Sequence, residues 1–159
     1  MGTKANLYDE DFYAWTQEQA ALLREGAVAE LDLANLAEEI ESLGISQKHA
    51  LGSHLKNLLL HLLKWRYQPS GRRTGHSWQS SIINARDEIA TLLEDMPGLR
   101  QELPGLFVRR YPAARRLAQA ETGLPLASFP RDCPWTLEEV LDADFWPGEA
   151  QESHPTDTR

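Results

Sequence analysis

The feature that most constrains the fold is a set of leucines between residues 46 and 67 that recurs with the period of an α-helix. The set consists of Leu51, Leu55, Leu58, Leu59, Leu62 and Leu63. At 3.6 residues per turn these side chains lie on one face of a helix. Because so apolar a face must be covered by other elements, the sequence predicts a helix over residues 46–67 at the centre of a bundle.

Other segments carry apolar stripes with recognisable helix start and stop signals. The predicted helices span residues 9–25, 32–44, 78–96 and 136–146, with two shorter pieces between residues 99 and 123, which Pro104–Gly105 and Pro112 delimit. Glycine adopts the left-handed conformation that ends helices, so Gly26, Gly44 and Gly123 are the predicted stops. Asp32 is a predicted N-cap, and Thr136 with Glu139 forms a capping box.

No stretch alternates apolar and polar residues for long enough to predict a strand, so the fold class is all-α. Short connections favour an up-down helical bundle with additional short helices. Residues 124–134 contain three prolines and are expected to wrap the bundle as an extended loop. We expect one helical domain over residues 1–147 and a polar, disordered tail over residues 148–159.

Charge is distributed unevenly along the chain, which has 159 residues and a net charge of -8. Residues 1–44 hold two basic and ten acidic side chains, residues 45–131 hold thirteen and six, and residues 132–159 hold one and eight. Either the acidic ends pack over the basic middle, or the middle exposes a face for an anionic partner. A single cysteine, the lack of a leader and the lack of a long apolar run predict a cytoplasmic protein without a membrane span.

Several polar residues fall on or beside apolar stripes and form a candidate polar-core cluster. Its members are Glu39, His54, His61, Arg86 and Glu121. Arg86 lies between Ile82 and Ile89 and must reach a carboxylate or solvent, because its guanidinium stays charged. Glu39 and Glu121 are the candidate partners of Arg86. Glu121 could instead pair with Arg110 or Arg115. The half-buried histidines are interpreted as hydrogen-bond donors that fix helix register.

A second group of residues has the composition of an anion-binding or nucleic-acid-binding patch. It comprises Lys64, Arg66, Arg72, Arg73 and Trp78. Cations interleaved with aromatic rings are how single-stranded nucleic acids are neutralised and stacked. The same tryptophan equally suits sealing of the bundle, and both interpretations remain open.

Motifs for phosphate-binding loops, nucleophile elbows and zinc proteases are missing from the sequence, so no cofactor and no metal site is predicted. His54 and His61 are seven residues apart and too far along a helix axis to share one metal easily. Cys133 lies between Asp132 and Pro134 and is expected to be packed rather than nucleophilic.

Several short strings together resemble the domain-of-unknown-function family 29. They are LAEEIESLG at residues 36–44, HLLKW at 61–65 and SW at 77–78, with further agreement at 111–115, 120–122, 129–134 and 144–147. The resemblance covers roughly residues 8–147 and implies a bacterial, helical protein. It implies no substrate, cofactor or catalytic residue.

Three functions remain open from the sequence. The first is a binding or regulatory module that acts through a protein partner or through self-association. The second is a nucleic-acid binder that uses the basic and aromatic residues between 64 and 78 together with the arginines from Arg109 to Arg116. The third is an enzyme with Glu39, His61 and Arg86 as acid–base groups. Because no catalytic motif is found, we favour the binding module.

Overall fold

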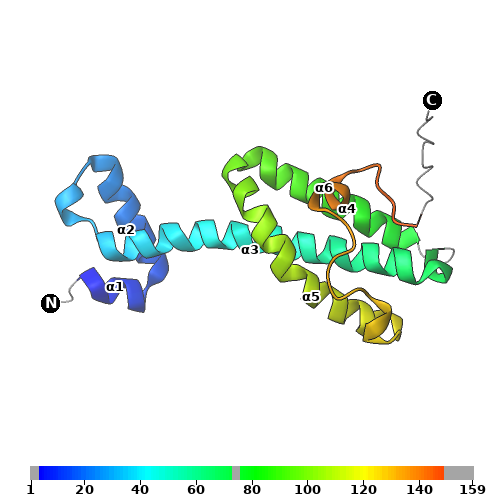
Figure 1. Cartoon of the computed structure of the whole chain (residues 1–159). Coiled ribbons are helices and arrows are strands. Elements are labelled where there is room, and N and C mark those ends of the chain that lie inside the picture. Colours follow the sequence, from blue (N-terminus) through cyan, green and yellow to red (C-terminus); the bar gives the residue numbers. More distant parts are fainter. Residues whose placement is uncertain (1–3, 73–75, 149–159) are drawn as a thin grey trace, which may run out of the picture. The chain divides into compact units, whose positions relative to one another are not determined.

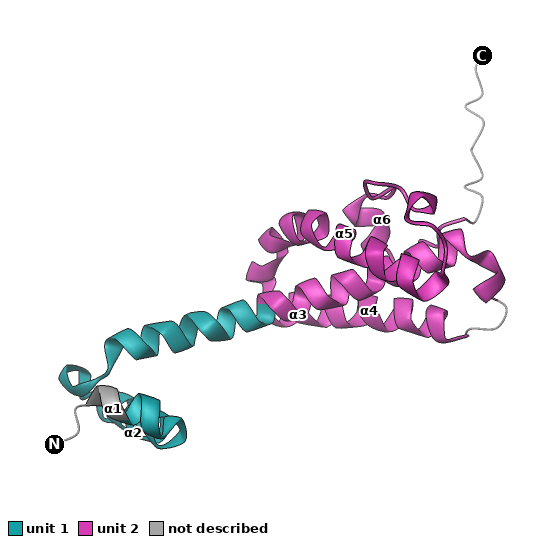
Figure 2. Ribbon diagram, turned by 90° about the horizontal axis from the view of Figure 1, so that it is seen from below, with its two compact units in different colours: residues 1–47 teal, residues 48–159 magenta. Residues whose placement is uncertain are grey.

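The computed structural model describes residues 4–72 and 76–148, and these residues form helices and turns without any strand. This confirms the all-α fold class. The chain divides into two compact units, residues 1–47 and residues 48–159, which we call the N-terminal and C-terminal units (Figure 2). A single domain over residues 1–147 stays a prediction. Residues 149–159 of the predicted tail lie outside the described residues.

The N-terminal unit begins with two helices, α1 (Lys4–Glu10) and α2 (Phe12–Glu25), where one helix over residues 9–25 was predicted. The single helix is wrong because Asp11 starts a new one: its carboxylate accepts a hydrogen bond from the Ala14 amide at 2.9 Å. Such a cap satisfies an amide that has no partner in the first turn. Gly26 has a φ of 71° and ends α2 as predicted.

Helix α3 (Leu33–Tyr67) follows the 3-10 turn η1 (Val28–Glu30) and contributes residues to both units. The prediction that a helix stops at Gly44 is wrong, since α3 continues through it without a positive φ. Glycine permits a left-handed stop but does not impose one, and its cost inside a helix is only about 1 kcal/mol. The two helices predicted over 32–44 and 46–67 are therefore one helix of 35 residues.

The C-terminal unit packs the later part of α3 against α4 (His76–Asp95), which returns antiparallel beside it, as the bundle prediction expected (Figure 1). The turn η2 (Pro69–Arg72) follows α3, and η3 (Pro97–Glu102) connects α4 to α5 (Leu103–Thr122). Helix α5 crosses the antiparallel pair (Figures 1 and 2). Gly123, with a φ of 72°, ends α5 where a stop was predicted.

Both prolines that were expected to interrupt residues 99–123 lie within α5 instead. Pro104 occupies the first turn, where its missing amide hydrogen has no intrahelical partner in any case. Pro112 lies inside the helix, and the carbonyl that it leaves without an amide partner is that of Val108, four residues earlier. Val108 is 69% exposed, so the turn that carries this carbonyl lies at the surface. The predicted break into two pieces is therefore wrong.

The core of the C-terminal unit is the leucine face of α3, closed by residues from α4, α5 and the segment after α5. All six leucines of the predicted stripe are fully buried. The segment after α5 contains the turn η4 (Leu126–Ser128) and buries Phe129 to 1% exposure. The Tyr111 hydroxyl donates to the carbonyl of Pro130 at 2.6 Å. The proline-rich segment thus wraps the bundle, as predicted.

Helix α6 (Leu137–Leu141) is shorter than the predicted 136–146. Its start is as predicted, because Thr136 and Glu139 form the reciprocal capping box. Its end comes early because the backbone at Asp142 is extended, with a φ of -70° and a ψ of 122°. The residues that follow form the wall of a pocket described below.

Candidate functional site

Arg86 is the arginine of the polar cluster, and it projects from α4 toward α6 and the segment that follows it. The residue is 6% exposed. Its Nε donates to the carbonyl of Val140 at 3.0 Å, and its Nη2 donates to that of Phe145 at 2.8 Å. A longer contact of 3.5 Å joins Nη1 to the carbonyl of Ala143. The guanidinium therefore holds the C-terminal segment in place through backbone oxygens.

This geometry corrects the prediction that Arg86 pairs with Glu39 or Glu121. Val140 lies in the last turn of α6, where helix carbonyls have no amide partner and carry partial negative charge. A forked, permanently charged donor satisfies several such carbonyls at once. Burial lowers the pKa of Arg86, and the nearby Asp142 carboxylate opposes that shift.

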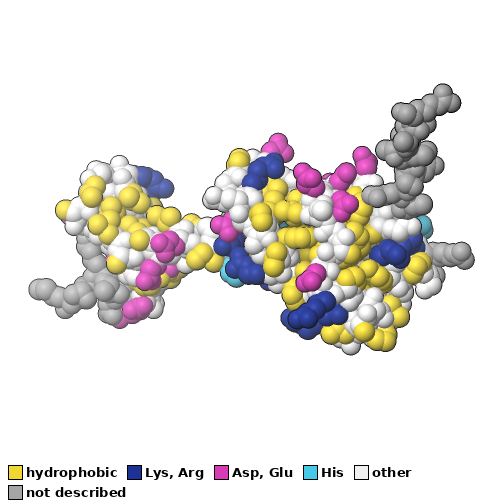
Figure 3. Space-filling model, viewed as in Figure 1, with side chains coloured by type: hydrophobic (Ala, Val, Ile, Leu, Met, Phe, Trp, Pro, Cys, Tyr) yellow, Lys and Arg dark blue, Asp and Glu magenta, His cyan; other side chains and the backbone are white. Residues whose placement is uncertain are grey.

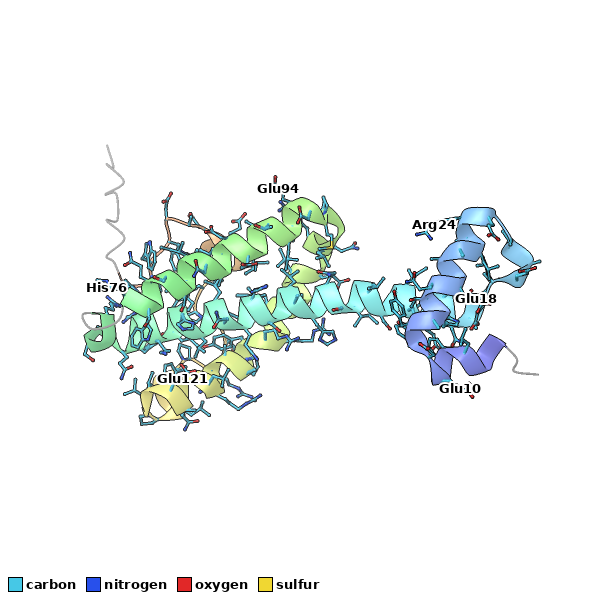
Figure 4. All side chains as sticks on the ribbon, turned by 180° about the vertical axis from the view of Figure 1, so that it is seen from behind. Glu10, Glu18, Arg24, His76, Glu94 and Glu121 are labelled. Atoms are coloured by element: carbon cyan, nitrogen blue, oxygen red, sulfur yellow. The ribbon has the colours of Figure 1, made fainter. Side chains whose placement is uncertain are left out.

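Glu121 pairs with Lys64 rather than with an arginine. The Lys64 Nζ lies 2.7 Å from a carboxylate oxygen of Glu121, which projects from the last turn of α5 (Figure 4). Lys64 is 8% exposed, and its Nζ also lies 4.8 Å from the ring centroid of Trp78. A cation here offsets the unfavourable position of Glu121 at a helix C-terminus. The predicted buried salt bridge is present, with a different cation.

Both histidines of the cluster are half-buried on α3, as the sequence indicated. The Nδ1 of His61 lies 2.8 Å from the carbonyl of Asn57, one turn earlier, which places the ring proton on Nδ1. Burial lowers the pKa of His61, and the positive charge of Lys64 lowers it further. This local bond agrees with the structural interpretation of His61.

Glu39 belongs to the N-terminal unit, where it accepts a short hydrogen bond from the hydroxyl of Tyr8. This bond raises the pKa of Tyr8 to about 12. Tyr8 packs edge to face on Trp15, with ring centroids 4.9 Å apart. The indole nitrogen of Trp15 in turn donates to Asp32 at 3.1 Å. Glu39 thus fixes α1 to α3 within this unit, and the predicted partner Arg86 donates elsewhere.

The candidate nucleic-acid patch is largely engaged in contacts within the C-terminal unit. Lys64 is buried, and Arg72 donates from Nε to the carbonyl of Trp65 while its guanidinium lies 5.0 Å from that ring. Arg66 is exposed and lies 5.3 Å from the ring centroid of Tyr67. Trp78 is half-buried, and its ring closely approaches Gly71. Arg73 lies outside the described residues.

Cys133 is half-buried in the wrapping segment. Burial raises the pKa of its thiol to about 11, so the nucleophilic thiolate is scarce at neutral pH. This agrees with the expectation that Cys133 is packed rather than nucleophilic.

A pocket that the sequence did not reveal lies on the C-terminal unit beside the segment after α6. Its volume is about 690 Å³, within the range of small-molecule sites. The residues that line it include Arg66, three aromatic side chains and three carboxylates: Trp135, Phe145, Trp146, Glu139, Asp142 and Asp144. The two acidic residues Asp142 and Asp144, followed directly by Phe145 and Trp146, were a signal for it, but the sequence predicted only the end of a helix there.

The N-terminal unit carries a second unusual feature, an apolar surface. Eight of the large hydrophobic side chains that the structure exposes belong to it: Phe12, Tyr13, Leu23, Val28, Leu33, Ile40, Leu43 and Ile45. Figure 3 shows hydrophobic side chains spread over the surface of this unit. The stripe over residues 33–43 was predicted as the inner face of a short helix. It lies at the surface instead.

A comparison with models of protein families assigns the chain to a family. The model described as "Domain of unknown function DUF29" matches residues 7–146. The chain belongs to this family. The DUF29 match extends through residues of both units, so the exposed stripe of α3 and the lining of the pocket fall inside it.

The DUF29 family supplies no substrate or activity, and no curated protein and no solved structure matches the chain. In the described part of the chain, no helix combines the length and apolar character that crossing a membrane requires. The family assignment agrees with the resemblance found in the sequence, and the function must be argued from the geometry.

Proposed function

We propose that this DUF29 chain is a protein-binding module whose N-terminal unit docks a partner protein on the exposed face of α3. The observation that carries the proposal is the exposure of three large aliphatic side chains on that face. Leu33 is 62% exposed, Ile40 is 66% exposed and Leu43 is 68% exposed. Apolar side chains gathered on a surface are typical of protein interaction sites.

The three residues share one side of the helix, within an arc of about 80° at 3.6 residues per turn. Together with the half-buried Leu36 they have the three-and-four spacing by which helices pack against one another. Every residue from Ile40 to Gln47 is exposed. A helical segment without tertiary cover is only marginally stable in water, so a docked partner would stabilise it.

Charge favours a partner of a particular kind over a second copy of the same surface. Residues 1–44 hold ten acidic and two basic side chains, a net charge of -8. Two such units facing each other would repel, whereas a surface with basic side chains around an apolar centre would be attracted. We therefore assign the face of α3 to a partner protein with an apolar, basic docking surface.

The test compares the wild-type chain with the double variant Ile40→Glu, Leu43→Glu. Because both side chains are exposed, the variant should unfold at the same temperature as wild type and yet lose a partner that wild type recovers from its own cell lysate. Val108→Glu, which changes a 69% exposed residue of the C-terminal unit, is the matched control and should retain that partner.

Two further readouts locate the contact and detect self-association. A photo-crosslinking amino acid at position 43 should capture the same partner, and light scattering should show a monomer. If wild type instead forms a stable oligomer and the double variant is a monomer, the exposed face of α3 binds a second copy of the chain. Identical recoveries from wild type and double variant, with both monomeric, would contradict the proposal.

The other two functions that the sequence allows gain less support from the geometry. Lys64 is buried against Glu121, so it is not available to a phosphate backbone. Among the proposed acid–base groups, Glu39 binds Tyr8 and His61 binds a carbonyl of its own helix. Arg86 binds the carbonyls of Val140 in α6 and of Phe145 after it. Each of these groups is thus engaged by a partner in its own unit.

A further inference from the structure

The walls of the pocket beside α6 are joined to the rest of the C-terminal unit by ring packing and hydrogen bonds. Trp146 packs against Trp65 with ring centroids 4.9 Å apart, and Trp135 meets Phe145 edge to face at 6.2 Å. Arg86 holds the backbone at Val140 and Phe145 through its guanidinium. A site whose walls are already ordered loses little conformational entropy when it binds.

The carboxylates of the pocket differ in how far they are engaged by the fold. One oxygen of Glu139 accepts from the Thr136 amide at 2.8 Å, and one oxygen of Asp142 accepts from the Asp144 amide at 2.9 Å. The Asp144 carboxylate has no hydrogen-bond or ion-pair partner in the part of the chain that the structure describes. Asp144 is therefore the carboxylate with both oxygens available to a ligand.

The charge of the lining is acidic, since three carboxylates and one arginine give 1 − 3 = −2. These carboxylates do not form a metal site: within residues 4–72 and 76–148, no group of three His, Cys, Asp or Glu side chains could hold a metal ion. The acidic charge stands instead beside three aromatic rings, and the Arg86 guanidinium already lies 5.6 Å from the centroid of one of them, Trp146. Rings attract cations through their faces, and most strongly when water is excluded.

We propose that this pocket binds an organic cation, an ammonium or guanidinium group that contacts the aromatic walls and pairs with Asp144. The group can belong to a free small molecule or to a lysine or arginine side chain of a peptide, because the recognising chemistry is the same. The proposal does not rest on the docking face of the N-terminal unit, since none of the pocket residues belongs to that unit.

The experiment is a titration of the ¹⁵N-labelled full chain, followed through the separate indole N–H signals of its five tryptophans. The probes are tetramethylammonium, N-acetylarginine amide and a tetra-arginine peptide. The signals of Trp135 and Trp146 should move with saturation, while that of Trp15, in the other unit, should stay in place. Saturation by the two small probes would indicate a free cation as the ligand, and saturation by the peptide alone would indicate a basic segment.

Two variants test the charge of the site in opposite directions. Asp144→Asn should weaken binding by about threefold to fivefold, the effect of losing one partly exposed ion pair. Arg66→Gln removes the positive charge of the lining and should strengthen binding of the same probes. Glu138→Gln is the control, because Glu138 is exposed on α6 and does not line the pocket.

The proposal is overturned if none of the three cations moves the Trp135 and Trp146 signals at concentrations of tens of millimolar. A preference for anions would also overturn it. In that case sodium acetate or sulfate would move the Trp135 and Trp146 signals at a concentration where the cations do not, and Arg66→Gln would abolish the shift caused by the anion. Loss of cation binding in Ile40→Glu, Leu43→Glu is not expected, so the two proposals can fail separately.

Discussion

The two compact units of this chain use apolar side chains in opposite ways. In the C-terminal unit, eighteen buried residues from Leu51 to Val140 form one core in the described part of the chain. In the N-terminal unit the residues described as buried are three: Trp15, Gln19 and Leu22. Most of its large aliphatic residues are at the surface.

The contrast teaches that one apolar helical stripe can serve two purposes. Along α3, the leucines of the stripe after residue 50 are buried, whereas Leu33 and Leu43 are exposed and Leu36 is half-buried. The spacing that closes a core in one unit leaves an exposed apolar face in the other, because burial depends on whether other elements reach the stripe. Removing side chains from the two halves of α3 should therefore have unequal effects on stability.

The largest expected effect comes from truncating the buried half of the stripe. Leu59→Ala should lower the free energy of unfolding by about 2–5 kcal/mol, because it leaves a cavity in a closed core. Leu43→Ala, the matched change in the exposed half, should alter it by less than about 0.5 kcal/mol. Urea denaturation followed by circular dichroism measures both. Equal losses would mean that the face at Leu43 is covered within the chain.

The next effect concerns the polar contact that organises the C-terminal unit. Arg86→Met should cost about 2 kcal/mol or more, because it leaves the buried carbonyl of Val140 and the part-buried carbonyl of Phe145 without a donor. Arg86→Lys should recover only part of this, since an ammonium lacks the fork that reaches several carbonyls. Arg100→Met, at an exposed arginine of η3, is the control for loss of charge. If Arg86→Met lowers the melting temperature no more than Arg100→Met does, the hydrogen bonds of Arg86 contribute little to stability.

A smaller effect tests whether α3 is continuous between the units. Gly44→Ala should stabilise the chain by about 0.5–1 kcal/mol, because alanine favours the helical backbone and a Cβ there meets nothing within 4 Å. At Gly52 a Cβ would lie 2.7 Å from the Arg110 Nε, so Gly52→Ala must displace that side chain and should gain less or lose stability. Destabilisation by Gly44→Ala in the same urea measurement would show that the helix breaks at Gly44.

The smallest effect is a pH dependence from the C-terminal unit alone. Burial lowers the pKa of His61 in the folded chain below its ordinary value of 6.5, so the unfolded chain binds a proton more readily. The stability that the neutral ring contributes is thus present above that value and is lost as the pH falls through it. Melting temperatures between pH 8 and pH 5 should fall less in His61→Gln than in wild type, with His76→Gln as the control. An unchanged pH profile in His61→Gln would contradict this role.

The burial of some polar side chains in the candidate site could be predicted from the sequence, but their hydrogen-bond partners could not. The burial of Arg86 and the half-burial of His61 followed from their positions on helical stripes. Their partners did not follow, because helical periodicity gives the direction of a side chain but not the element that it meets. Arg86 donates to carbonyls of residues 140–145, whose oxygens have no signature in the sequence. Lys64 was assigned to a nucleic-acid-binding patch because cations and aromatic rings interleave around it, and that pattern does not reveal that Lys64 is buried.

By itself the sequence determined the all-α fold class, the helix stops at Gly26 and Gly123, the capping box at Thr136 and the buried leucine face of α3. These are local properties, set by spacing and by the conformations that each residue permits. Only the tertiary structure decided that α3 continues through Gly44, that the stripe from Leu33 to Leu43 stays at the surface, and that the residues after α6 form a pocket. Those outcomes depend on which segments pack against a given face, and packing between residues distant in the chain leaves no periodic trace in the sequence.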